Sequence, residues 1–250
     1  MFDALKKKVK GRLTGYLRRE IELASRDIDY ARQQKAAAES AALIDQYMPM
    51  AKSYPDRFAL LRAVVGQVEV SGLCCEFGVY QGKTINFIAS LLPGEIHGFD
   101  SFEGLPEDWR GGLEKDTFAL SSLPPVLGNV RLHRGWFEDS IAPFKEKHSG
   151  PVALLHLDAD LYSSTRTVLE LLEDRIVAGT VIQFDEFFNY PGWQEGEYKA
   201  FAEFCSRRRV EPHYLGYTRC GEQVAVKIAK IQAEPCYTSV PCSLSKTGTG

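Results

Sequence analysis

The chain has 250 residues, 44% of them hydrophobic, and a formal net charge of −3. This length and composition can bury a substantial core in one large domain or two small ones. The slight acidic excess argues against nucleic acid as the main partner, because phosphate binding normally requires a basic excess. No run of about 18 apolar residues predicts a membrane span, and the charged N-terminus does not resemble a secretory signal.

The six cysteines form no C-x-x-C pair and no regular framework. They are best interpreted as small buried side chains or free thiols in a reducing compartment, so a cytoplasmic location is expected. The cysteines are Cys74, Cys75, Cys205, Cys220, Cys236 and Cys242.

Residues 1–56 are predicted to form an N-terminal helical arm or lid. The segment up to about residue 48 is rich in Ala, Lys, Arg, Glu and Leu, and Pro49 and Pro55 end it. Its first part is strongly basic, which is compatible with an amphipathic anchor on a membrane or an acidic partner. We favour a solvated arm that packs on another subunit or covers a cleft, and we expect a homo-oligomer formed through it.

Residues 57–230 alternate between short apolar strands and helices. After a helix over 57–66, strands are expected near 73–79, 95–102, 130–137, 151–160 and 179–187, with two more over 212–229. This alternation predicts an α/β fold, a doubly wound and mostly parallel seven-stranded sheet with helices on both faces. The last two strands should add antiparallel pairing. Residues 231–250 lack periodicity and are predicted to be a loose tail.

Chemically useful residues follow five successive strands of this predicted sheet. Ligands of open α/β sheets bind outside the carboxyl ends of the strands, so these residues should share one crevice. They are Glu76 and Gly78, Asp100, the turn at 135–137, Asp158 with Asp160, and Asp185 with Glu186.

The loop after the first of these strands reads E-x-G-x-x-x-G rather than the G-x-G-x-x-G of dinucleotide folds. Its glycines allow close backbone approach by a ligand, but Glu76 would repel a pyrophosphate. S-adenosylmethionine fits better, since it has an ammonium, a sulfonium and no phosphate. Asp100 follows one βα unit later, where an acid can bind ribose hydroxyls. The predicted cofactor-binding set is Glu76, Gly78, Tyr80, Gly82, Asp100, Ser101, Phe137, Asp139, Ser140 and Asp158.

Asp158, Asp185 and Glu186 leave two neighbouring strands at the same edge. Three crowded carboxylates repel one another, and a divalent cation would offset that repulsion. Oxygen-only ligands suit Mg²⁺, which could hold a substrate diol and lower the pKa of the hydroxyl to be methylated. In the alternative interpretation Asp158 binds only the cofactor and Asp185 caps a helix.

The predicted catalytic residues are Asp158 and three candidate general bases, His156, Asp160 and His213. Each base also has a plain structural interpretation. His156 lies in an apolar strand, Asp160 can hold the loop before the next helix, and His213 can begin a strand. Trp193 is a candidate for stacking on a sugar ring.

The stretches EFGVYQGKT, GFDSFEGLPEDW, GWFEDS, LLHLDADLYSST and VIQFDEFFNYPGWQEG together resemble the macrocin O-methyltransferase (TylF/MycF-type) family of class I methyltransferases. The resemblance covers about residues 57–228. It implies methyl transfer from S-adenosylmethionine to a sugar or similar hydroxyl in the presence of magnesium. The family's metal acids fall on Asp158, Asp185 and Glu186, where the family usually has a second aspartate at the last position, and its cofactor carboxylates fall on Glu76 and Asp100.

The predicted function is therefore that of a magnesium-dependent O-methyltransferase acting on a hydroxylated, sugar-containing small molecule. A catechol-type O-methyltransferase is the nearest alternative. A nicotinamide-dependent oxidoreductase is disfavoured by Glu76 and by the missing third glycine. A non-catalytic binding module is disfavoured by the acids at the strand ends. Protein or nucleic-acid methylation is not expected, because no basic face lies near the site and no N/D-P-P-Y loop follows the fourth strand.

Overall fold

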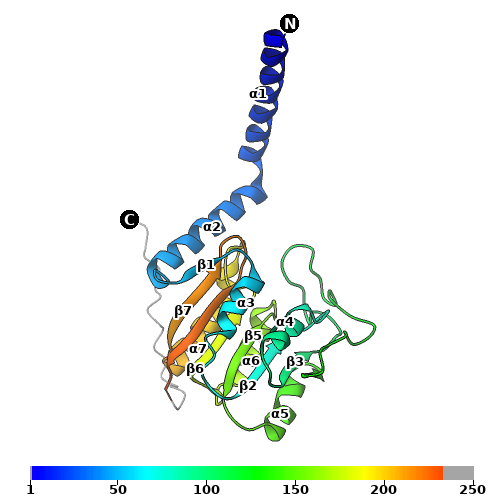
Figure 1. Ribbon diagram of the computed structural model, residues 1–250, viewed down its shortest axis with the longest axis vertical. Coiled ribbons are helices and arrows are strands. Elements are labelled where there is room, and N and C mark those ends of the chain that lie inside the picture. The colour runs from blue at the N-terminus through cyan, green and yellow to red at the C-terminus, as the bar shows by residue number, and fades with distance from the viewer. Residues whose placement is uncertain (1, 233–250) are drawn as a thin grey trace.

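The computed structural model describes residues 2–232, with side chains from residue 6 onward. Eight strands form one sheet in the order β1-β7-β8-β6-β5-β2-β3-β4 (Figure 1). The strands are β1 Lys52–Tyr54, β2 Leu73–Phe77, β3 Ile96–Asp100, β4 Val130–Arg134, β5 Val152–Leu157, β6 Ile176–Phe184, β7 Glu211–Thr218 and β8 Val224–Lys230. The helices are α1 Phe2–Arg26, α2 Ile28–Tyr47, α3 Arg57–Val65, α4 Lys83–Leu91, α5 Phe137–Lys147, α6 Tyr162–Leu171 and α7 Glu197–Arg208, with a short 3₁₀ helix η1 at Trp193–Glu195.

The predicted α/β fold with a mostly parallel sheet is confirmed. Strands β4, β3, β2, β5 and β6 pair in parallel, and β8 runs antiparallel between β6 and β7. The chain reverses its direction of winding between β2 and β5, and such a switch point is where ligands bind in open α/β sheets.

Within residues 2–232 the sheet has eight strands, so the prediction of seven was wrong. The additional strand, β1, pairs in parallel with the edge strand β7, with Lys52 opposite Gly216. Gly216 permits this approach, since a Cβ there would lie 2.6 Å from the Tyr54 ring. Three residues between two prolines carry no local strand pattern, and only the free edge of β7 makes them a strand.

Helices cover both faces of the sheet and form two hydrophobic clusters. Helices α3 and α4 contribute one cluster with β-strand residues such as Leu154 and Val181. In α4 the buried residues Ile85, Ile88 and Ala89 recur at helical spacing, which places one apolar stripe on the sheet. Helices α5, α6 and α7 cover the opposite face around the aromatic side chains of β2, β3 and β6.

The N-terminal arm consists of two helices with different surroundings. Helix α2 begins after Asp27, whose Oδ1 accepts a hydrogen bond from Tyr30 N–H at 3.0 Å, and it buries Ala36 and Leu43 in the larger cluster. Helix α1 projects away from the sheet, and nearly all its side chains from residue 6 onward are exposed (Figure 1). The helices of residues 2–232 include none with the length and hydropathy that a membrane span requires.

The cysteines within the described residues form no disulfide. Burial raises the pKa of the Cys75 thiol, so this residue behaves as a small apolar side chain. Cys236, Cys242 and all but the first two residues of the predicted tail lie outside the described residues.

Three histidines gather where β3, β4 and α5 meet. His97 Nδ1 lies 3.2 Å from His133 Nε2, and the His148 ring centroid lies 4.6 Å from that of His97. Burial, followed by repulsion from His148 and His133, lowers the pKa of His97 to about 4, and burial and His148 also lower the pKa of His133. Glu95 raises the pKa of His97, whereas Arg131 lowers it further. Lys147 lowers the pKa of His133.

This cluster should make the fold sensitive to acid. In the unfolded chain the imidazoles of His97 and His133 would bind protons below a pKa of about 6.5. The folded protein is therefore most stable above that pH and loses stability as the pH falls toward 4. Replacing His97 with asparagine should reduce the loss of unfolding free energy between pH 7.5 and 5 by about 1–2 kcal/mol. Urea unfolding at both pH values measures this slope, and the exposed His213→Gln is the control. An unchanged slope in the His97 variant would contradict the assignment.

Candidate active site

A cavity of about 720 Å³ opens at the carboxyl ends of β2, β3, β5 and β6. It brings together eight of the predicted site residues, which are Gly78, Tyr80, Asp100, Ser101, Phe137, Asp158, Asp160 and Glu186. The rest of its wall comes from the segment over 104–118, from the start of α5 and α6, and from Arg57. No residue of 6–56 lines it, so the arm does not cover the cavity in this structure.

The glycine loop after β2 is held close to the end of the neighbouring strand β5. Gly78 has φ +89°, and a Cβ there would lie 1.7 Å from the carbonyl oxygen of Asp158. The Asp100 carboxylate organises the same loop, since its Oδ2 accepts hydrogen bonds from Val79 N–H and Tyr80 N–H at 2.8 Å each. Its Oδ1 accepts a third from Phe102 N–H at 2.6 Å. Each carboxylate oxygen can accept more than one bond, so Asp100 can still receive ribose hydroxyls.

Three other predicted cofactor residues lie outside the cavity wall. Gly82, with φ +77°, precedes helix α4, and Asp139 is exposed on the first turn of α5. The Ser140 hydroxyl donates to the Trp136 carbonyl at 2.9 Å and is therefore used within its own helix. Phe137 does line the cavity, and its ring packs edge-on against Phe77 at 5.2 Å.

Glu76 and His156 form a fully buried contact inside the sheet rather than at its rim. They are register partners on β2 and β5, and His156 Nδ1 lies 3.3 Å from Glu76 Oε2. On the other side His156 Nε2 lies 3.7 Å from Asp185 Oδ1. Burial alone would lower the pKa of His156, but contacts with Asp185 and Glu76 raise it to about 10. A protonated imidazole has no free lone pair, so His156 does not suit the role of general base.

Two further predicted site residues, the candidate base His213 and the candidate sugar-stacking residue Trp193, do not line the cavity. His213 is exposed on β7 opposite Lys227, which pairs with Val181 well before the carboxyl end of β6. Its strand therefore places it away from the cavity. Trp193 is buried and packs edge-on against Tyr198 at 4.9 Å, so it is not available to stack on a sugar.

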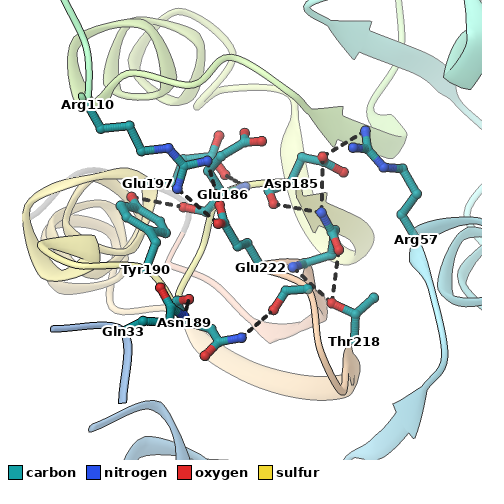
Figure 2. A network of polar contacts seen from close by, with 12 residues as sticks. Gln33, Arg57, Arg110, Asp185, Glu186, Asn189, Tyr190, Glu197, Thr218 and Glu222 are labelled. Atoms are coloured by element: carbon teal, nitrogen blue, oxygen red, sulfur yellow. Dashed lines mark hydrogen bonds and ion pairs between the residues drawn. The ribbon is translucent and has the colours of Figure 1, made fainter. Parts of the chain in front are cut away.

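Arg57 is a site residue that the sequence analysis did not identify. Its Nη1 lies 2.9 Å from Asp185 Oδ2 (Figure 2). The same nitrogen lies 3.6 Å from Asp158 Oδ2. Gln223 Nε2 also donates to Asp185 Oδ2 at 3.2 Å. Asp185 is thus enclosed by two cations and an amide and does not line the cavity. No local pattern marks Arg57, because its partners are distant in the sequence.

The acids that can share a cation differ by one residue from the predicted set. Oxygen atoms of Asp158, Asp160 and Glu186 lie within 4.8 Å of one another, whereas Asp185 groups with His156 and Asp158. Burial, together with the charge of Asp185, raises the pKa of all three clustered acids, that of Asp160 to about 7. These are the oxygen-only donors that a hard divalent ion prefers, so the group fits Mg²⁺ with Asp160 in the place predicted for Asp185.

The turn that carries Glu186 is held from both sides. Glu197 Oε2 accepts a hydrogen bond from Glu186 N–H at 2.9 Å, and Tyr190 O–H donates to the Glu186 carbonyl at 3.3 Å (Figure 2). Asn189, at φ +63°, donates its backbone N–H to Ser40 Oγ and accepts a bond from Gln33 Nε2. Helix α2 therefore helps to fix the position of the segment that carries Glu186.

A loop over 101–129 covers the cavity, a role the sequence analysis had considered for the arm. Its Arg110 guanidinium is sandwiched between the rings of Trp109 and Tyr190, at 4.2 and 4.4 Å. The same guanidinium makes two contacts of 2.9 and 2.8 Å with the carboxylate of Glu222, on the turn between β7 and β8 (Figure 2). This bidentate pair closes the loop onto the sheet.

Replacing Arg110 with alanine should release this loop. We expect cleavage at residues 104–118 by a limiting protease to be at least several-fold faster, and the KM for a substrate bound in the cavity to rise about 10-fold while the melting temperature changes little. Glu222→Gln keeps the shape of the partner and should give a smaller effect in the same direction. Proteolysis rates equal to those of the wild type would show that the pair does not hold the loop.

The fold and the site are similar to those of methyltransferase domains. Residues 75–187 match the family model described as a methyltransferase domain. Among solved structures, the calicheamicin methyltransferase CalS11 has a TM-score of 0.57 at 20% identity, over 80% of this chain and 93% of that chain. The O-methyltransferase NovP has a TM-score of 0.52 at 21% identity, over 70% and 80%. At these identities the structures establish a shared fold.

The sequence comparison adds a curated relative from Streptomyces olivaceus, 8-demethyl-8-(2,3-dimethoxy-alpha-L-rhamnosyl)-tetracenomycin-C 4′-O-methyltransferase. It is 31% identical over 147 residues, which are 47% of this chain and 54% of the relative. The chain thus spans about half the length of this relative. The predicted resemblance to sugar-modifying class I methyltransferases is confirmed by these matches.

Proposed function

We propose that the protein is an S-adenosylmethionine-dependent O-methyltransferase that acts on a hydroxyl of a sugar or another polyol-bearing small molecule. The observation that carries this proposal is a single cavity that joins the glycine loop and Asp100 to the carboxylates of Asp158, Asp160 and Glu186. The name of the tetracenomycin relative, which specifies a sugar 4′-hydroxyl, supports a glycosylated acceptor.

The chain offers a complementary surface for each part of the cofactor. Asp100 can receive the ribose hydroxyls, Phe137 and Trp136 provide apolar contacts for the adenine, and Gly78 allows the methionyl end to approach the backbone. When bound, the cofactor supplies a methyl group on a positively charged sulfur. The surrounding acids favour that charge, and the covering loop excludes water from it.

The balance of charge supports magnesium as a second cofactor. Six carboxylates line the cavity and four more adjoin it, against three cationic side chains, which are Arg57, Arg110 and His156. The lining carboxylates are Asp100, Glu107, Glu138, Asp158, Asp160 and Glu186, and the others are Glu76, Asp185, Glu197 and Glu222. Residues Asp158, Asp160 and Glu186 would hold the ion, and a bound Mg²⁺ would lower the pKa of an acceptor hydroxyl.

Catalysis would depend mainly on orientation and electrostatics. Asp158 and Glu186 would fix the position of the hydroxyl groups of the acceptor. The loop over 104–118 would hold the acceptor against the cofactor for in-line transfer. Asp160 would hold the ion through one carboxylate oxygen and is the candidate proton acceptor through the other, because it lines the cavity whereas His156 is enclosed by acids and His213 lies elsewhere.

Calorimetry with S-adenosylmethionine tests the cofactor, and methyl transfer to a panel of glycosylated and catechol acceptors tests the substrate class. We expect cofactor binding at micromolar concentration, transfer to sugar hydroxyls, and loss of turnover in excess EDTA that added Mg²⁺ restores. The absence of binding at near-millimolar cofactor would reject the proposed function. Transfer to catechols alone would favour the alternative acceptor class.

We further propose that helix α1 pairs with α1 of a second copy. Exposed apolar side chains recur along it, and pairing with a second copy of the helix would remove them from water. The exposed apolar residues of α1 are Val9, Leu13, Tyr16, Leu17, Ile21 and Leu23.

Light scattering on the full chain tests this pairing. The wild type should be a dimer or larger, and the double variant Leu13→Asp, Leu17→Asp should be a monomer. The matched change Arg18→Gln, on the opposite face of the helix, should leave the mass unchanged. A monomeric wild type that binds anionic vesicles would reject pairing and support the membrane-anchor interpretation instead.

A further inference from the structure

The guanidinium of Arg57 is only partly used by the acids it touches. Both of its ion pairs, with Asp185 and Asp158, involve the same nitrogen, Nη1. Its Nε and Nη2 have no hydrogen-bond partner among residues 6–232. The side chain is 41% exposed and lines the cavity, although Asp185 is completely buried. Two nitrogens of the guanidinium, Nε and Nη2, are therefore available to a ligand in the cavity.

Arg57 enters the cavity at a defined place along the sheet. In the proposed function, Asp100 on β3 lies at the ribose of the cofactor, and Gly78 after β2 lies where its methionyl end begins. The next strand across the sheet from β2 is β5. Arg57 meets Asp158 directly after β5. It comes from the first turn of α3, where Asp56 Oδ1 accepts a hydrogen bond from Ala59 N–H at 2.9 Å and fixes the start of the helix.

The methionyl end of the cofactor carries both an ammonium and a carboxylate. The acids of this edge favour the ammonium, but they would repel the carboxylate unless a cation met it. A guanidinium edge matches a carboxylate with two parallel N–H···O bonds. Among the residues that line the cavity, Arg110 is already paired with Glu222, whereas Arg57 has donors to spare.

We propose that Arg57 binds the carboxylate of the cofactor's methionyl end through Nε and Nη2 while Nη1 stays on Asp185. This inference rests on the proposed function, because it requires that cofactor. It makes Arg57 a cofactor-binding residue in addition to its role as counter-ion of the buried acids. A residue from helix α3, outside the segment that matches the methyltransferase domain, would then select for the complete amino-acid end of the cofactor.

Calorimetry with two ligands separates the two roles of Arg57. The probes are S-adenosylhomocysteine and its decarboxylated analogue, each titrated into the wild type and into Arg57→Gln. The wild type should bind S-adenosylhomocysteine about 10- to 100-fold more tightly than the analogue, and the variant should lose most of that preference. Loss of the counter-ion affects both ligands alike and cancels in the comparison.

Arg62→Gln is the matched control, since Arg62 lies on the same helix with its guanidinium over the Phe87 ring, and it should keep the full preference. Arg57→Lys covers the case in which the glutamine variant does not fold, because it retains the counter-ion charge but not the paired donors. Its preference should fall to an intermediate value. A wild type without preference, or an Arg57 variant that keeps the full preference, would overturn the proposal. A wild type that binds neither ligand would instead reject the proposed function.

Discussion

Replacing Asp158 with asparagine should lower turnover by about 10²–10³-fold while the protein remains folded. Asp158 belongs to both groups of potential metal ligands, lines the cavity and touches Arg57. Asparagine keeps its size but removes the charge that would attract a divalent ion. The measurements are the rate of methyl transfer over a range of Mg²⁺ concentrations and the heat of Mg²⁺ binding in the presence of S-adenosylhomocysteine.

Two further variants show whether the effect comes from the site. Asp174→Asn changes an acid whose partners are Lys145 and Arg175, away from the cavity, and it should leave turnover unchanged. Asp185→Asn should mainly reduce stability, by about 3–5 kcal/mol, because it leaves His156 and Arg57 without their shared partner. An Asp158 variant that retains more than a tenth of wild-type turnover, or wild-type turnover that is unchanged by EDTA, would remove the ion from the mechanism.

Replacing Gly78 with alanine should destabilise the fold by at least about 4 kcal/mol and abolish cofactor binding. The residue has φ +89°, which side chains with a Cβ rarely adopt, and that Cβ would lie 1.7 Å from the Asp158 carbonyl oxygen. Strands β2 and β5 would have to separate at the point where the cavity is formed. Urea unfolding monitored by tryptophan fluorescence measures the loss, with S-adenosylhomocysteine calorimetry on any variant that folds.

Other glycines provide a graded comparison for Gly78. Gly82→Ala meets the strain of φ +77° but no atom closer than 3.4 Å, so it should cost only about 1–2 kcal/mol. Gly94→Ala has neither strain nor a neighbour within 4 Å and should change the unfolding free energy by less than about 1 kcal/mol. Equal losses at Gly78 and Gly82 would show that backbone strain, and not the contact between strands, dominates.

The position of the cavity could be predicted from the sequence because it follows from strand ends. Apolar runs that stop at Gly78, Asp100 and Asp158 identify the carboxyl edge of a parallel sheet, and the fold necessarily gathers these ends. The preference for a cationic over a phosphate-containing ligand rested on Glu76, which the structure buries against His156, so the acids at the strand ends that line the cavity are Asp100, Asp158, Asp160 and Glu186 instead.

The sequence by itself determined the α/β class, the edge that carries the site and the acidic character of that edge. The tertiary structure alone decided which charges meet, placing Arg57 on Asp185, His156 between two acids and Arg110 on Glu222. It also decided that Glu76 lies inside the sheet and that the loop over 101–129 covers the cavity. The physical reason is that helix and strand periodicity is local, whereas a charge is neutralised by whichever residue the fold brings within a few ångströms, however distant in the chain.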